Sequence, residues 1–150
     1  NPRLGLMLLD LPQVAPTSHP RFEAAGMADR LRIECGSFLT DPIPKGADAI
    51  SLVRVLYDHS DETVRELLAK CHAALPPQGR LIISEPMTGG AQPTRAGDAY
   101  FALYTLAMRT GRTRSAPEIS ALCTASGFVD VKTPTARRPF VTSCVEARKA

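Results

Sequence analysis

The sequence predicts an α/β fold with a mostly parallel sheet, and three observations lead to that expectation. Short apolar runs of strand length alternate with segments whose apolar residues recur at helical spacing. Polar residues follow directly after several of these runs. The last two strand-like segments are separated by a turn too short to cross back over a sheet, so we expect that pair to be antiparallel.

The first third of the chain contains three predicted strands and one short helix. The run Arg3–Leu9 is almost continuously apolar, which is typical of a strand buried on both faces. The following Pro- and Ala-rich segment holds a short helix around Arg21–Ala25. The segment Arg30–Cys35 alternates charged and apolar residues, which indicates one exposed face. After a loop with two prolines and two glycines, Asp48–Leu56 is the third strand.

A longer helix follows the third strand. Ser60 or Asp61 can cap its start, and it is expected to run to about Leu75. Its apolar residues form one stripe that should face the sheet: Val64, Leu67, Leu68, Cys71 and Leu75.

The rest of the chain predicts one more strand, two helices and a closing strand pair. Arg80–Ser84 is the fourth strand, and helices are expected over Asp98–Arg109 and Ala116–Ser126. Strands over Phe128–Lys132 and Pro139–Glu146 close the chain.

The composition excludes several classes of protein. The chain has 150 residues, of which 44% are hydrophobic and 22% charged, as in an ordinary globular domain. Its formal net charge of +3 is spread without a run of like charge, so we expect no nucleic-acid partner. No apolar stretch is long enough for a membrane span. The four cysteines are widely spaced without a C-x-x-C pair, so we expect reduced thiols and no metal site.

Polar side chains stand where the predicted parallel strands end. These residues are Asp10, Gly36-Ser37, Tyr57-Asp58 and Glu85. In open α/β sheets, ligands bind at the carboxyl ends of the strands. The sequence therefore predicts a site at this edge of the sheet.

Three segments together resemble the S-adenosylmethionine-dependent O-methyltransferases of the caffeate and hydroxyindole type. They read "LLDLPQV", "GSFLTDPIPKGADAISLVRVLYDHSDETVRELLAKCHAALPPQGRLIISEPM" and "TGRTRSAPEISALCTASGF", in order from about Leu8 to Phe128. The stretches "YDHSDETV", "EPMTGG" and "GDAYFALYTLAMRTGRTRS" look most like the bacterial carotenoid O-methyltransferases of the demethylspheroidene type.

The resemblance implies a Rossmann-like class I methyltransferase sheet with an antiparallel last strand. Such enzymes open the domain with a strand and a Gly-rich loop, but this chain has no G-x-G-x-x-G. Residues 1–150 are therefore expected to be the C-terminal portion of a catalytic domain. The first strand, its loop and a helical N-terminal domain that forms a homodimer would lie upstream.

The resemblance implies that three residues bind S-adenosylmethionine. Asp10 would accept hydrogen bonds from both ribose hydroxyls, whereas the alternative is a turn-forming Asp before Leu-Pro. Phe38 would cover the adenine ring, or else be a loop Phe packed into the core. Ser37 stands where the family usually has an Asp, so it offers only a hydroxyl to the adenine amino group.

The catalytic residues implied by the resemblance are Tyr57, Asp58 and Glu85. The plant-type enzymes have a His base where this chain has Tyr57, and a phenol is a poor base near pH 7. Tyr57 is therefore expected to orient the acceptor, and Glu85 to bond the substrate hydroxyl or Tyr57. His59 would have to turn inward to act as the base, and its alternative is a surface position.

Three further positions near these residues are expected to lie outside the catalytic group. The family has a second acidic residue in the segment Gly111–Ser115, but this chain has Thr113 at that position. The support that the acid would give to the catalytic residues is therefore lost. Asp61 and Glu62 are better explained as helix-start residues.

The acceptor site is expected to be apolar. The helix Asp98–Arg109 is apolar around most of its circumference, with Tyr104 and Met108 in it and Met87 upstream as pocket linings. A hydroxylated carotenoid would suit such a wall. The alternative is that this helix is buried against the upstream domain or a partner subunit.

The sequence thus predicts an O-methyltransferase acting on a hydroxylated carotenoid. Three other functions stay open: a methyltransferase of another pigment such as a tetrapyrrole, a nicotinamide dehydrogenase, and a non-catalytic interaction domain. The expected location is cytoplasmic, with a peripheral contact to the inner or photosynthetic membrane as a way to collect substrate.

Overall fold

Strands and helices alternate along the chain, as the sequence predicts. The computed structural model describes residues 3–89, 92–93, 95–135 and 142–150. The strands are β1 (Leu6–Asp10), β2 (Leu31–Cys35), β3 (Ala49–Val53), β4 (Arg80–Glu85), β5 (Phe128–Lys132) and β6 (Ser143–Lys149). The α-helices are α1 (His19–Ala24), α2 (Asp61–Ala74), α3 (Phe101–Met108) and α4 (Ala116–Ala125). Part of the predicted strand Pro139–Glu146 lies outside the described residues, and β6 extends beyond its predicted end.

The strands of the described residues form two hydrogen-bonded sheets. The first joins β1 and β2 in parallel, and the second has the order β3-β4-β6-β5. In the second sheet β3 and β4 are parallel, whereas β6 is antiparallel to both β4 and β5. The antiparallel closing pair is confirmed. The position of β6 between β4 and β5 could not be predicted from the short connection alone.

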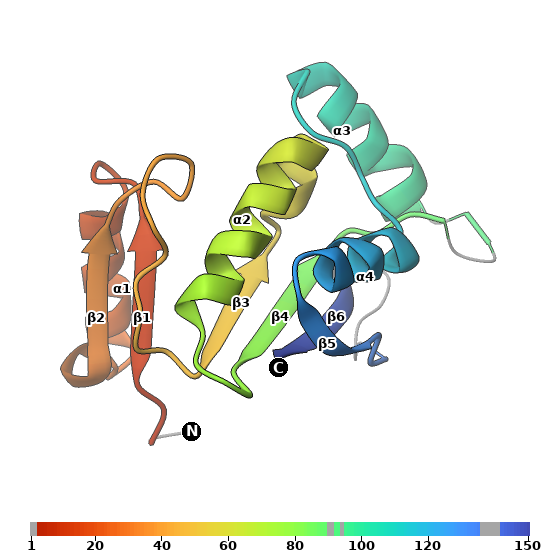
Figure 1. Cartoon of the computed structure of the whole chain (residues 1–150). Coiled ribbons are helices and arrows are strands. Elements are labelled where there is room, and N and C mark those ends of the chain that lie inside the picture. Colours follow the sequence, from red (N-terminus) through yellow and green to blue (C-terminus); the bar gives the residue numbers. More distant parts are fainter. Residues whose placement is uncertain (1–2, 90–91, 94, 136–141) are drawn as a thin grey trace.

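The edges of β1 and β3 that face each other have no strand partner among the described residues (Figure 1). The first strand was expected to be buried on both faces, and this prediction is wrong because all five residues of β1 are only half-buried. Because β2 is its one strand partner within the described part of the chain, β1 is covered only in part. The open edges are compatible with the upstream strand that the resemblance implies, which stays a prediction.

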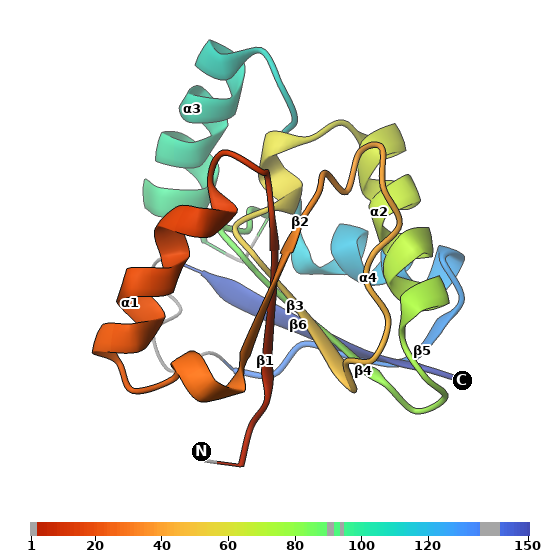
Figure 2. The same cartoon turned by 90° about the vertical axis from the view of Figure 1, so that its left-hand side faces the viewer.

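The predicted apolar stripe of α2 forms the centre of the core. Its five residues are buried against strands β3, β4 and β6 and against α4. Ser60 caps the helix by accepting a hydrogen bond from the amide of Thr63 at 3.3 Å. In Figure 2, α2 and α4 lie on one side of the strands and α1 on the other. The cysteines are free, with Cys71 and Cys123 buried in the core.

Helix α3 stands at the carboxyl edge of the strands (Figure 1). The predicted helix Asp98–Arg109 is divided, because a π-helical turn, η4 (Arg95–Tyr100), precedes α3. Phe101 and Thr105 face inward, whereas Leu103 and Leu106 are 66% and 73% exposed. No helix among the residues described here is long and apolar enough to cross a membrane.

Candidate active site

The joint between β3 and α2 is a tight turn whose central side chains are buried. After Val53 the backbone of Arg54 takes a left-handed conformation, with φ 57°, and enters the 3-10 turn η3 (Leu56–Asp58). The Tyr57 side chain is only 6% exposed. The joint is thus both a capped helix start and a folded turn that holds a buried phenol.

Glu85, the last residue of β4, fixes the start of this turn. Its side chain is 1% exposed, and Oε1 accepts hydrogen bonds from the amides of Val55 at 2.7 Å and Leu56 at 2.8 Å. Oε2 is buried without a hydrogen-bond partner among the described residues. The carboxylate therefore bonds to the backbone next to Tyr57 rather than to the Tyr57 hydroxyl. In this structure Glu85 is a positioning residue for the turn.

An aromatic group joins the turn to α3. The Tyr57 ring lies 5.3 Å from the Phe101 ring and 5.9 Å from the Tyr104 ring, measured between centroids. The guanidinium of Arg54 lies over Phe101 at 5.2 Å and over Tyr57 at 6.0 Å. Two of the predicted site residues, Tyr57 and Tyr104, are thus brought together.

The surroundings of Tyr57 keep its hydroxyl protonated. Burial raises the pKa of Tyr57 above the ordinary value of 10.0, and Arg54 offsets only part of that increase. The phenol is therefore protonated near neutral pH and able to donate a hydrogen bond.

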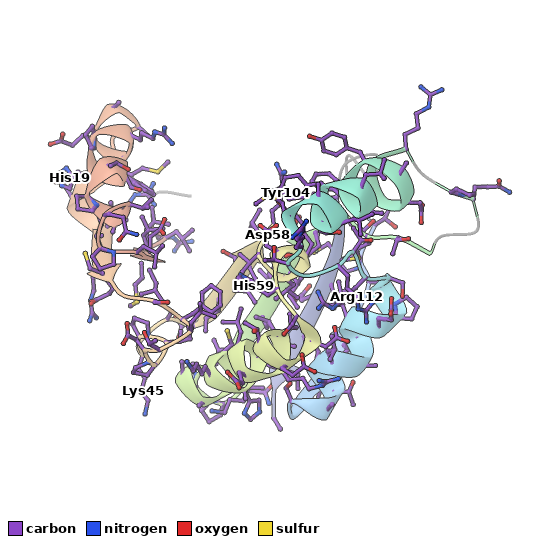
Figure 3. All side chains as sticks on the ribbon, turned by 90° about the horizontal axis from the view of Figure 1, so that it is seen from above. His19, Lys45, Asp58, His59, Tyr104 and Arg112 are labelled. Carbon is purple, nitrogen blue, oxygen red and sulfur yellow. The ribbon has the colours of Figure 1, made fainter. Side chains whose placement is uncertain are left out.

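His59 faces the loop that carries Phe38 instead of the aromatic group. The two rings meet edge to face, with centroids 5.1 Å apart. Burial lowers the pKa of His59 in spite of the opposing charge of Asp58, so the ring is neutral near pH 7. In Figure 3, Asp58, His59 and Tyr104 lie near one another, whereas His19 lies far away on α1.

The predicted cofactor residues lie at the ends of β1 and β2. Asp10 pairs with Cys35 across the parallel ladder, which puts Asp10 beside Gly36 and Ser37. Lys70 on α2 holds the following loop by donating hydrogen bonds to three carbonyl oxygens, of Phe38 at 2.6 Å and of Leu39 and Asp41 at 3.1 Å. These bonds fix the backbone that carries Phe38.

Comparison with known proteins identifies the family. The model of the O-methyltransferase domain family (Methyltransf_2) matches residues 1–129. The chain belongs to that family. It is 55% identical over 146 residues to the demethylspheroidene O-methyltransferase of Cereibacter sphaeroides, covering 97% of this chain. It is also 55% identical over 148 residues to the enzyme of that name from Rhodobacter capsulatus, covering 99% of this chain.

The chain spans 38% and 36% of the lengths of these two relatives. Among solved structures, the mitomycin 7-O-methyltransferase MmcR has the same fold, with a TM-score of 0.88 and 30% identity. That match covers 99% of this chain and 43% of the MmcR chain. The predicted family and class I methyltransferase fold are confirmed.

The predicted site residues of this O-methyltransferase domain lie in two places. The first place is the turn after β3, which contains Tyr57 and Asp58, is contacted by Tyr104 and is bonded to Glu85. The second place is the ends of β1 and β2, where the three predicted cofactor residues lie. The contact between Phe38 and His59 joins the two places.

Two predicted acceptor contacts lie outside the aromatic group. Met87 is half-buried against the core, and Met108 is 54% exposed at the end of α3. Their roles as acceptor contacts stay predictions.

Sequence reasoning missed three residues that hold or contact the candidate site. Arg54 was visible as the single charge inside an apolar run, which is an unusual place for a guanidinium. Lys70 gave no signal, because its partners are backbone oxygens distant in sequence. Arg114 binds a distant backbone oxygen of Leu56 and the Asp61 carboxylate 53 residues away, and neither partner can be read from its neighbours in the sequence. Among the described residues, no group of three His, Cys, Asp or Glu side chains is arranged to hold a metal ion.

Replacing Glu85 with Gln should change how stability depends on pH. Burial raises the pKa of Glu85 above 4.5, so its contribution to folding is complete at pH values below 4.5 and is lost as pH rises through the raised value. Gln keeps an oxygen for the two amides and cannot ionise. The melting temperature of E85Q relative to wild type should therefore increase as pH rises above 4.5 and level off once the pH exceeds the raised pKa of Glu85. Thermal unfolding of both proteins over a series of pH values on both sides of 4.5 checks this increase. A difference in melting temperature that does not change with pH would contradict the prediction.

Proposed function

We propose that the protein carrying this chain transfers a methyl group from S-adenosylmethionine to a hydroxyl of an apolar acceptor, with a hydroxylated carotenoid as the substrate. The observation that carries the proposal is the 55% identity to two demethylspheroidene O-methyltransferases over nearly the whole chain. The buried phenol at the β3–α2 joint and the apolar helix above it agree with such an acceptor.

The residues at the ends of β1 and β2 fit the cofactor. A carboxylate at Asp10 suits a ribose diol, a hydroxyl at Ser37 suits an amino group, and the ring of Phe38 suits an adenine face. Lys70 holds the backbone of this loop before any ligand arrives, which lowers the cost of ordering it. When bound, the cofactor supplies a methyl group on a positively charged sulfur.

The chain's own contribution to the reaction is mainly positioning. Methyl transfer is an in-line displacement, so rate depends on holding the acceptor oxygen in line with the methyl–sulfur bond. Tyr57, held protonated by burial, bonds the acceptor oxygen and orients it. A tertiary alcohol is too weakly acidic to ionise beforehand, so its proton leaves to water only as the new oxygen–carbon bond forms and the methyl–sulfur bond breaks. A hydrogen-bonding phenol tolerates that order better than an early deprotonation. Asp58 directly follows Tyr57 in the turn, and we include its carboxyl group among the proposed catalytic residues.

The acceptor binds against α3 in this proposal. Tyr104 and Phe101 would line the end near Tyr57, and Met87 and Met108 would contact the apolar tail. We also propose a homodimer formed through an upstream domain, and a cytoplasmic enzyme that touches the membrane to collect its substrate. The strongly exposed side chains of α3 support an apolar contact of one of these kinds.

The test is a methyl-transfer assay with the full-length protein. It is incubated with S-adenosylmethionine and either a tertiary carotenoid alcohol or a hydroxylated tetrapyrrole, and the products are analysed by mass spectrometry. We expect a methyl ether of the carotenoid alone. A methylated tetrapyrrole would refute the carotenoid assignment, and cofactor binding without any product would indicate a non-catalytic domain.

A further inference from the structure

We propose that Gly111 and Arg114, in the connection between α3 and α4, are positioning residues that hold the Tyr57 turn in its active shape. This inference rests on the proposed function, because the active shape is the one that presents Tyr57 to the acceptor. The two residues are far from Tyr57 in the sequence and reach it only through the fold. Figure 1 shows the connection from α3 to α4 passing the start of α2.

Gly111 lies directly against the backbone of the turn. Its φ is +65°, and an added Cβ would lie 2.2 Å from the carbonyl oxygen of Tyr57 and 2.4 Å from the amide nitrogen of His59. It would also lie 2.5 Å from the carbonyl carbon of Asp58. These neighbours are backbone atoms and cannot rotate away, so any side chain at Gly111 must displace the turn.

Arg114 binds the same turn through its carbonyl groups. The side chain is almost fully buried, and Nη1 donates to the carbonyl oxygen of Leu56 at 2.8 Å. Nη2 donates to the carbonyl oxygen of His59 at 2.9 Å and to Oδ1 of Asp61 at 2.7 Å. Nε donates to the same Asp61 oxygen at 2.8 Å. One planar group thus ties both ends of the Leu56–His59 segment to the first turn of α2.

Glu85 and Arg114 hold the turn in complementary ways. Glu85 accepts from the amides of Val55 and Leu56, whereas Arg114 donates to the carbonyls of Leu56 and His59. The backbone polar groups on both sides of Tyr57 are therefore bonded to the buried side chains of Glu85 and Arg114. Rotation of the turn would break several of these bonds at once.

The same segment is bonded to the loop after β4. The amide of Thr88 donates to the carbonyl oxygen of Arg114 at 3.1 Å, and the Thr88 hydroxyl donates to Asp98 in the turn before α3. The Tyr57 turn, the loop after β4 and the base of α3 are thus linked through the Gly111–Arg114 segment. We infer that this linkage sets the Tyr57 hydroxyl against an acceptor lying on α3.

The first experiment compares Arg114→Lys with Arg112→Lys in the full-length protein. Lys keeps the positive charge, but its single nitrogen cannot reach all three oxygens. Arg112 is a matched control because it bonds the same Asp61 at 3.1 Å and Glu118 at 2.9 Å on the surface, without a hydrogen bond to a carbonyl of the described turn. We expect R114K to lower kcat about 10- to 100-fold, as misplacement of a reacting group does. The dissociation constant for S-adenosylmethionine should stay unchanged, and R112K should match wild type in both.

The second experiment compares Gly111→Ala with Gly26→Ala. Both glycines have positive φ, +65° and +63°, so both substitutions strain the backbone in the same way. Gly111 contacts the turn, whereas nothing lies within 4 Å of a Cβ at Gly26. We expect G111A to lose most of its turnover and G26A to retain it.

A spectroscopic readout separates positioning from a merely structural role. With 3-fluorotyrosine at position 57, the fluorine resonance reports the surroundings of the ring directly. It should shift in R114K and G111A and stay in place in R112K and G26A. An unchanged resonance in folded R114K and G111A, or wild-type kcat in both, would overturn the proposal. If the wild-type protein methylates no acceptor, the proposed function fails, while the resonance still tests whether these residues position Tyr57.

Discussion

Tyr57→Phe should lower the turnover number of the full-length protein at least about tenfold, because it removes a hydrogen-bond donor worth roughly 1.5 kcal/mol in the transition state. The ring itself should stay in place. It is buried against Phe101 and Tyr104, and Phe fills the same space. Steady-state kinetics with the carotenoid alcohol and saturating S-adenosylmethionine measure the effect.

Tyr100→Phe is the matched control for this variant. Tyr100 is 64% exposed just before α3, so loss of its hydroxyl should leave turnover as in wild type. An unchanged rate in Y57F would remove Tyr57 from the reaction and leave the aromatic group as packing alone.

Asp10→Asn should weaken binding of S-adenosylmethionine about 10- to 100-fold, since a hydrogen bond to a charged group contributes about 1.5–3 kcal/mol. The carboxylate at the end of β1 is the group proposed to accept both ribose hydroxyls, and an amide has one oxygen to offer. Isothermal titration calorimetry on the full-length protein measures the dissociation constant.

The control for this experiment is Asp48→Asn. Asp48 is exposed and precedes β3, at the opposite end of the strands from Asp10. D48N should bind the cofactor as wild type does. Equal affinity in D10N and wild type would show that Asp10 only forms the turn before Leu11, whose amide donates to Oδ1 of Asp10 at 2.8 Å.

The elements with strong local signals were predicted well. The stripe of α2, its cap and the stop at Pro76 all follow from neighbouring residues, and α2 ends within one residue of its expected end. The elements that depend on distant partners were predicted less well. The apolar run of β1 indicated burial that its neighbours do not supply, and the insertion of β6 between β4 and β5 has no local signal.

In the candidate site, too, some features follow from the sequence and others depend on partners distant in the sequence. Parallel strands end at a common edge, so the alignment of Asp10 with Ser37 and the nearness of Tyr57 to Glu85 follow from the order of strands. The role of Glu85 toward the backbone of the turn does not follow, because a carboxylate at that place could equally have faced a ligand. His59 also needed the structure, since its ring turns toward Phe38.

By itself the sequence determined the family, the class of fold and the polar residues that stand at the strand ends. These depend on hydrophobic spacing and on residue types in a fixed order, which a linear chain displays. The tertiary structure alone decided which groups hold the Tyr57 turn: Gly111, Arg114 and Glu85 meet there from segments far apart. Within the turn their partners are backbone atoms, which every residue carries, so no pattern of side chains could reveal these contacts. The one side-chain partner, the Asp61 carboxylate that binds Arg114, is 53 residues away in the sequence.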